Sequence, residues 1–216
     1  IPTILNVVGG IFASSWQISS VENFGSEESK SFYSSVYKKY FSLFACVASG
    51  IILFIKILAK LLFAKDFYNA WPYATLLVLA SLMQAMGQFY ETIYISAMKP
   101  TALLGTTILA AVINTALNFV LIPHFGAYGA SLATLIGYAA MYFVRIFNSQ
   151  RIFRFSVNHK KNVFTIVLLV VEACTVCLNV SGWLVIDVLC TLGIVWINRE
   201  VVEDIYTVLM KILKKN

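Results

Sequence analysis

Three polar side chains share one face of an apolar segment long enough to cross a membrane. Gln84, Gln88 and Glu91 lie in the segment 71–97, and their spacing of four and three residues places them on one side of a helix. Polar groups inside a membrane face the bundle interior or a water-filled cavity. These side chains therefore either line a wet cavity for a polar substrate or join helices through hydrogen bonds, and the sequence leaves both interpretations open.

The next apolar segment, 101–122, carries a second polar stripe. Thr107, Asn114 and Asn118 are spaced seven and four residues apart and again share one helical face. Lying next to the first stripe in the sequence, they are candidates for the same cavity. For the two asparagines, hydrogen bonds between helices are the favoured interpretation.

Four ionisable residues lie in other apolar segments. Lys56 and Lys60 are one turn apart near the end of the segment 40–62. Extension of their amines to the headgroups is the favoured interpretation, and the alternative is that Lys56 binds a phosphate in the cavity. Glu172 and Asp187 are candidate carboxylates for coupling transport to a proton or cation, or each pairs with a base from another helix.

Signatures of enzymes are absent from the sequence. It contains no nucleophile elbow, no glycine-rich phosphate loop and no cluster with metal-ligand spacing. The four cysteines, Cys46, Cys174, Cys177 and Cys190, lie in apolar runs and are interpreted as small buried hydrophobic residues. We therefore expect no catalytic residue, no metal and no cofactor.

The composition requires a membrane environment. Hydrophobic residues make up 60% of the chain and charged residues 12%, whereas soluble domains carry about 25% charged residues. A membrane-crossing helix needs about 20 predominantly apolar residues. We predict an all-α, polytopic transmembrane bundle with about seven spans, and residues 199–216 as an amphipathic tail on the cytoplasmic surface. The predicted spans are 1–20, 40–62, 71–97, 101–122, 128–147, 163–180 and 183–198.

Residues 26–40 are expected to extend the helix that follows them, and Pro123 is expected to end the helix before it. In the segment 128–147, Gly129, Ala133 and Gly137 recur every four residues. This spacing of small residues allows close helix packing.

Loop charges indicate the orientation. If the spans alternate in direction, thirteen of the sixteen basic residues fall on one side, including the loop 145–162 that begins with Arg145. Cytoplasmic loops are enriched in lysine and arginine, so this side and the C-terminus are predicted to face the cytoplasm. Because the basic residues are scattered over four segments at the membrane edge, nucleic acid is not an expected partner, whereas membrane lipids are.

Residues 113–138 read INTALNFVLIPHFGAYGASLATLIGY. This stretch resembles the polysaccharide-export branch of the multidrug/oligosaccharidyl-lipid/polysaccharide exporter superfamily, in which an Asn-rich helix ends in Ile-Pro before a Phe-Gly-x-x-Gly-Ala turn. The matching positions are Asn114, Asn118, Ile122, Pro123, Phe125, Gly126, Gly129, Ala130, Ala133 and Thr134.

The resemblance implies the C-terminal half of a flippase for O-antigen or capsule repeat units, with the seven spans as one lobe of a two-lobed transporter. Such a protein moves undecaprenyl-pyrophosphate-linked oligosaccharides across the bacterial inner membrane by alternating access. The chain begins with Ile1 rather than Met, and we expect the N-terminal lobe of the same protein as its partner. The polysaccharide polymerase is a further expected partner.

Other functions are compatible with parts of this pattern. A drug exporter or a peptidoglycan-precursor exporter of the same superfamily would share the helix pattern. A membrane-embedded polysaccharide polymerase would need a large external loop, and the predicted external loops 63–70, 123–127 and 181–182 are short. Nothing in the sequence excludes a membrane scaffold without transport activity.

Overall fold

Helices make up the regular structure of the chain. The computed structural model describes residues 1–22, 24–25, 27–201 and 203–204, and these ranges contain no β-strand. The prediction of an all-α bundle is confirmed. The predicted amphipathic tail, 199–216, lies for the most part outside the described residues.

The elements in chain order are α1 (Thr3–Glu22), α2 (Glu27–Leu53), α3 (Ile55–Leu62), the 3-10 helix η1 (Lys65–Ala70), α4 (Trp71–Ser96), α5 (Pro100–Phe125), α6 (Ala127–Ile152), α7 (His159–Cys177) and α8 (Trp183–Ile197).

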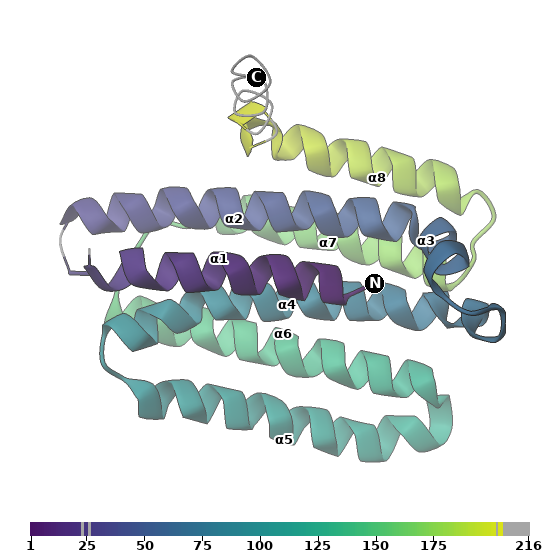
Figure 1. Ribbon diagram of the computed structural model, residues 1–216, viewed down its shortest axis with the longest axis horizontal. Helices are drawn as coiled ribbons and strands as arrows, with labels where there is room; N and C mark the ends of the chain where they lie inside the picture. Colours follow the sequence, from purple (N-terminus) through teal and green to yellow (C-terminus); the bar gives the residue numbers. More distant parts are fainter. Residues whose placement is uncertain (23, 26, 202, 205–216) are drawn as a thin grey trace.

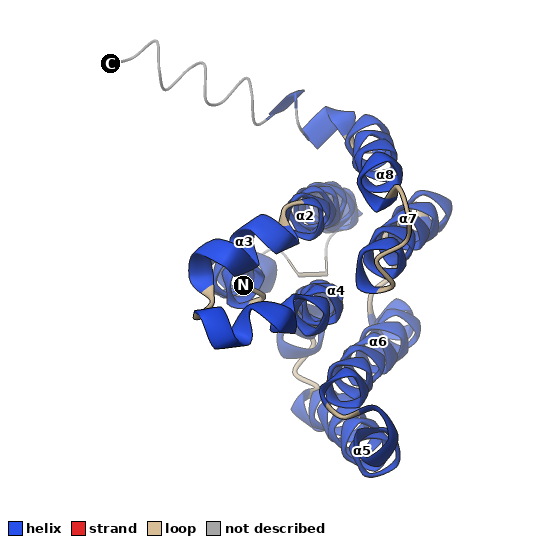
Figure 2. Cartoon of the chain, turned by 90° about the vertical axis from the view of Figure 1, so that its right-hand side faces the viewer, coloured by secondary structure: helices blue, strands red, loops and turns tan. Residues whose placement is uncertain are grey.

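The helix α4 lies at the centre of the bundle (Figures 1 and 2). It packs against α1, α2, α6 and α7, whereas α5 packs mainly on α6, and α8 on α7 and α2. Connections at residues 97–99 and 153–158 lie at one end of the bundle, and those at Gly126 and 178–182 lie at the other (Figure 1). Successive long helices therefore run in opposite directions.

Aromatic side chains fill the core around α4. The Phe89 ring stacks on Trp16 of α1, with ring centroids 5.3 Å apart, and meets Tyr37 of α2 edge-on at 5.1 Å. The α6–α7 connection adds Phe153 and Phe155, which are both buried against this cluster. Aromatic pairs of this kind contribute about 0.5–1.5 kcal/mol each beyond their burial.

The predicted span 40–62 is wrong as a single helix. The helix α2 already begins at Glu27, which includes the expected extension, and Phe54 separates it from α3. At this break the chain turns (Figure 1), and Ile55 and Ala59 become fully buried as α3 packs back on α4. Burial of this apolar face explains why the helix does not continue straight.

Pro123 does not end α5, contrary to the sequence prediction. The helix continues to Phe125 and stops at Gly126, whose φ of 55° lies in the left-handed region. Pro123 has no N–H to donate, but the last turn still forms, because Gly126 N donates to the Ile122 carbonyl at 2.8 Å. Gly126 adopts the reversed conformation without the clash that a Cβ atom would cause.

Three described helices are long and apolar enough to cross a membrane: residues Glu28–Leu53, α5 and α6. The helix α8 is apolar but shorter. Only 11% of the apolar stretch of α5 is buried, and Ile108, Val112 and Phe119 are exposed on it. An apolar surface of this extent is suited to lipid or to another apolar protein surface.

Alanine at Gly129 is expected to destabilise the α5–α6 hairpin. A Cβ atom there would lie 2.4 Å from the backbone oxygen of Leu121, and overpacking of this kind costs about 1–3 kcal/mol. The measurement is the free energy of unfolding in mixed detergent micelles.

The matched control is Gly105→Ala on α5, where a Cβ atom would meet nothing within 4 Å. Alanine there is expected to stabilise the helix by roughly 0.5–1 kcal/mol. Equal unfolding free energies for the two variants would contradict the close contact at Gly129.

Candidate functional site

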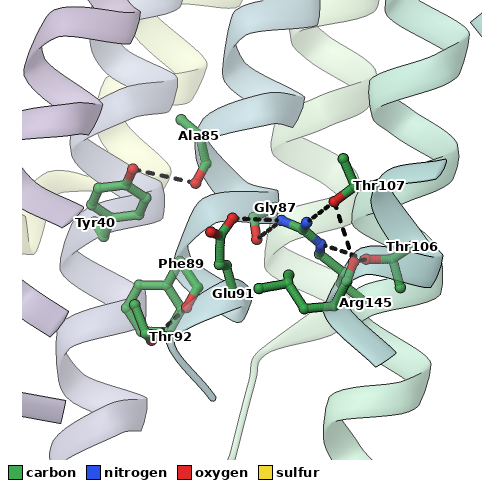
Figure 3. Close-up of polar contacts among 10 residues, drawn as sticks. Tyr40, Ala85, Gly87, Phe89, Glu91, Thr92, Thr106, Thr107 and Arg145 are labelled. Atoms are coloured by element: carbon green, nitrogen blue, oxygen red, sulfur yellow. Dashed lines mark hydrogen bonds and ion pairs between the residues drawn. The ribbon is translucent and has the colours of Figure 1, made fainter. Parts of the chain in front are cut away.

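A buried arginine joins three helices through a cluster of polar contacts (Figure 3). Arg145 of α6 is only 2% exposed. On α5, its Nε donates to Thr106 Oγ1 at 3.0 Å and one terminal nitrogen donates to Thr107 Oγ1 at 3.1 Å. On α4, the other terminal nitrogen donates to the Gly87 carbonyl at 2.9 Å and to Glu91 Oε2 at 3.2 Å.

Arg145 was assigned to a cytoplasmic loop from the sequence, and this assignment is wrong. The helix α6 extends to Ile152, five residues beyond the predicted span, and encloses Arg145 in the bundle. A sequence signal for this was available, because Met141 and Arg145 continue the four-residue spacing of Gly129, Ala133 and Gly137, and all five residues are buried. Without Arg145, the predicted cytoplasmic side still has twelve basic residues, and the opposite side has three.

Gly87 allows this close approach. A Cβ atom on Gly87 would lie 2.8 Å from Met141 Cε and 3.7 Å from the Arg145 nitrogen that binds its carbonyl. A Cβ atom here would crowd the flexible end of Met141, whose side chain would have to shift to keep the two helices this close.

Glu91 connects the buried arginine to a solvent-accessible groove. Its side chain is 38% exposed, in contrast to that of Arg145. Together with Gly10 and Gln17 of α1 and Gln88 of α4, it lines a groove of about 130 Å³. The structure thus brings Gln88 and Glu91 together at one groove. Gln84 is partly buried on the same helix and does not line it.

A second cavity, of about 350 Å³, lies between α5 and α6 beside Thr107. Asn114 lines it and donates to Thr134 Oγ1 of α6 at 3.3 Å. Asn118 donates to Asn114 Oδ1 at 3.0 Å. Asn114 therefore connects α5 to α6 and places an amide group at the cavity wall, whereas Asn118 supports it from the same helix.

We call the residues of these two cavities and the arginine between them the polar band. Its members are Gln17, Gln88, Glu91, Arg145, Thr107 and Asn114. They come from α1, α4, α5 and α6, so no local stretch of sequence contains the whole band.

Lys56 lies with α8 and not with the polar band. Its amine donates to Asn179 Oδ1 at 2.8 Å and lies 4.0 Å from the ring centroid of Trp183 and 4.7 Å from that of Trp71. Two aromatic faces stabilise its charge at this position. Lys60, one turn further along α3, is exposed.

Glu172 and Asp187 are fully buried where α7 and α8 pack together. Their side chains accept or share hydrogen bonds with Ser49 of α2, Thr175 of α7 and Thr191 of α8. Within the described residues, neither carboxylate forms an ion pair with a base.

Lysines cluster at the end of the bundle where α2 starts. Lys38 pairs with Glu200, and Lys39 Nζ lies 2.6 Å from Asp204 Oδ2. The hydrogen bond from Lys38 and its charge lower the pKa of Glu200. A cavity of about 370 Å³ lies beside Lys38 and is also lined by Lys161 and Asn158. The two exposed lysine–carboxylate pairs contribute little to the free energy of unfolding.

Comparisons with known proteins do not identify a family. No family model, no curated protein and no solved structure matches this chain. No group of three metal-binding side chains occurs in the part of the chain that the structure describes. Functional inference therefore depends on the polar band, the buried carboxylates and the resemblance at residues 113–138.

Replacing Arg145 with alanine is expected to destabilise the bundle by about 3 kcal/mol, because it removes several charge-assisted bonds and leaves buried acceptors unpaired. Glu91→Gln should cost less than about 1 kcal/mol, because Glu91 is partly exposed and its amide replacement can still accept from Arg145. Chemical denaturation in mixed micelles measures both values. Equal losses in the two variants would show that Arg145 is not the centre of the cluster.

Proposed function

We propose that this chain is part of a membrane transporter that moves undecaprenyl-pyrophosphate-linked oligosaccharide repeat units across the bacterial inner membrane, for O-antigen or capsular polysaccharide synthesis. The observation that carries this proposal is the polar band, which includes side chains from four helices of a bundle whose core is mostly apolar. Polar groups at that depth are costly in lipid and are expected where a polar substrate passes.

The chemistry of the polar band suits a sugar-phosphate headgroup. The amides of Gln17, Gln88 and Asn114 can donate to and accept from sugar hydroxyls. Arg145 is held in place and always charged, and guanidinium groups bind phosphate oxygens well. Glu91 is partly exposed and balances this charge, so a phosphate group would have to displace it to reach the buried guanidinium.

We further propose that the bundle is one lobe, with about seven spans, of a transporter that works by alternating access. The exposed apolar face of α5 and the polar band beside it would face the second lobe across the substrate path. The expected second lobe is the N-terminal half of the same protein. The basic residues at one end of the bundle support a cytoplasmic position for that end and for the C-terminus.

One observation favours a second candidate function. Arg145 and Glu91 neutralise each other, so the polar band carries no net positive charge from this pair. A groove with an accessible carboxylate at Glu91 would also suit a cationic drug. The alternative function is therefore export of a cationic compound, and the experiment must distinguish it from transport of a lipid-linked oligosaccharide.

The test is transport by the whole protein, both lobes included, in liposomes that contain a lipid-linked oligosaccharide labelled on its sugar. Gln88→Leu and Thr107→Val are each expected to lower the rate about tenfold, which corresponds to about 1.4 kcal/mol of lost stabilisation. Ser14→Ala is the matched control, because Ser14 is exposed and bonds only to Gly10 of its own helix.

Unchanged rates in both polar-band variants would contradict the proposal. Transport of a cationic drug that Glu91→Gln abolishes, without transport of the oligosaccharide, would establish the alternative instead. The same liposomes with residues 1–216 alone test the lobe proposal, for which no transport is expected.

A further inference from the structure

The pair of carboxyl groups on α7 and α8 has an unusual set of partners. Glu172 and Asp187 are both 0% exposed. One oxygen of each, Glu172 Oε2 and Asp187 Oδ2, is buried without a hydrogen-bond partner among the described residues. Buried ionised carboxylates without a paired cation are very costly, so something must neutralise these two groups.

The hydrogen bonds around Glu172 are one hydrogen short if its carboxyl group is ionised. Ser49 Oγ lies 2.8 Å from Glu172 Oε1 and 3.0 Å from Thr191 Oγ1, and Thr191 Oγ1 lies 3.0 Å from the same Oε1. The three oxygen atoms form three contacts, but the two hydroxyl groups supply only two hydrogens. A proton on Glu172 supplies the third.

The hydrogen bonds around Asp187 are also one hydrogen short if its carboxyl group is ionised. Thr175 Oγ1 lies 2.5 Å from Asp187 Oδ1, 3.0 Å from the Val171 carbonyl oxygen and 2.9 Å from the Glu172 carbonyl oxygen. Its hydroxyl has one hydrogen, and the two carbonyls can only accept. If Asp187 is protonated, it donates to Thr175, and the Thr175 hydrogen is then free to bond to a backbone carbonyl.

Few other charges reach the pair. Among the residues that the structure describes, Lys56 of α3 and Cys190 of α8 are the other titratable groups that interact with these carboxyl groups. The amine of Lys56 is bound to Asn179 and two indole rings instead. The charged residues of α2 all precede Tyr40, and Glu91, the one charged residue of α4, is paired with Arg145.

We propose that Glu172 and Asp187 form a proton-binding site where α2, α7 and α8 meet, and that both carry a proton in the packed bundle. Proton release puts two negative charges on adjacent helices in a medium of low dielectric constant, and their repulsion loosens α8 from α7 and α2. This assignment holds whether or not the chain transports a lipid-linked substrate. Taken with the proposed function, it names the proton as the ion whose binding changes the bundle.

Infrared spectroscopy of the chain in lipid nanodiscs at pH 7 tests the proposal. Protonated carboxyl groups have a C=O stretching band, separate from that of carboxylates, that shifts on exchange into heavy water. We expect E172Q and D187N each to remove about half of this band. E91Q is the matched control and should leave the band unchanged, because Glu91 is partly exposed and paired with Arg145.

A spectrum that neither E172Q nor D187N alters would overturn the proposal. Loss of the band when sodium chloride replaces choline chloride at constant pH would also overturn it, because the site would then bind a metal cation.

Melting temperature provides the second measurement. The folded site keeps protons that an unfolded chain releases at about pH 4, so the wild-type protein should lose stability as pH rises from about 4 to the pH at which the folded site releases its protons, with no further loss from this site above that pH. The E172Q/D187N double variant mimics the protonated pair, so it should fold, and its melting temperature should fall less with rising pH than that of the wild-type protein. Failure of this variant to fold would contradict the assignment.

Discussion

A guanidinium group inside an apolar bundle needs partners for its N–H groups, and Arg145 finds them on two neighbouring helices. This requirement constrains the whole lower half of the bundle. The helix α5 has little other contact with α4, and its outer face is exposed and apolar. Bonds from Arg145 to Thr106 and Thr107 therefore add a polar link to the packing of α5 on α6. The same arginine bonds to Glu91, which lines the groove beside α1, and to Thr107, which lines the cavity between α5 and α6. It thereby links the two cavities of the polar band.

The upper half of the bundle uses neutral hydrogen bonds in place of an ion pair. Ser49, Thr175 and Thr191 surround two acids, and no base lies against them in the described residues. One half thus has a buried charge balanced within the protein, and the other has two buried acids without a paired base among the described residues. The central helix α4 packs on both halves, through α6 on one side and α7 on the other. The helix α4 is therefore the element that contacts both groups of polar residues.

The helical class and most helix positions could be predicted from the sequence, because apolar length and period are local properties. A polar residue in an apolar segment is conspicuous, so the sequence also singles out Gln88 and Glu91, which the structure places at one groove. Arg145 was missed because it lies near a helix end, where hydropathy cannot separate a buried charge from a loop charge. The break at Phe54 was missed because it depends on how Ile55 and Ala59 pack on another helix. Partners such as Ser49 for Glu172, 123 positions apart, follow only from the tertiary structure.

The connection between α6 and α7 differs from an ordinary surface loop. Phe153 and Phe155 lie in the aromatic core, and Ser156 N bonds to Ser34 Oγ of α2 at 3.0 Å. Reporter fusions and epitope tags used to map membrane topology are usually inserted at such connections. An insertion at 153–156 would withdraw two core side chains and so report on a misfolded protein. The turn at 178–182, where Leu178 and Val180 are exposed, is the safer place for a tag.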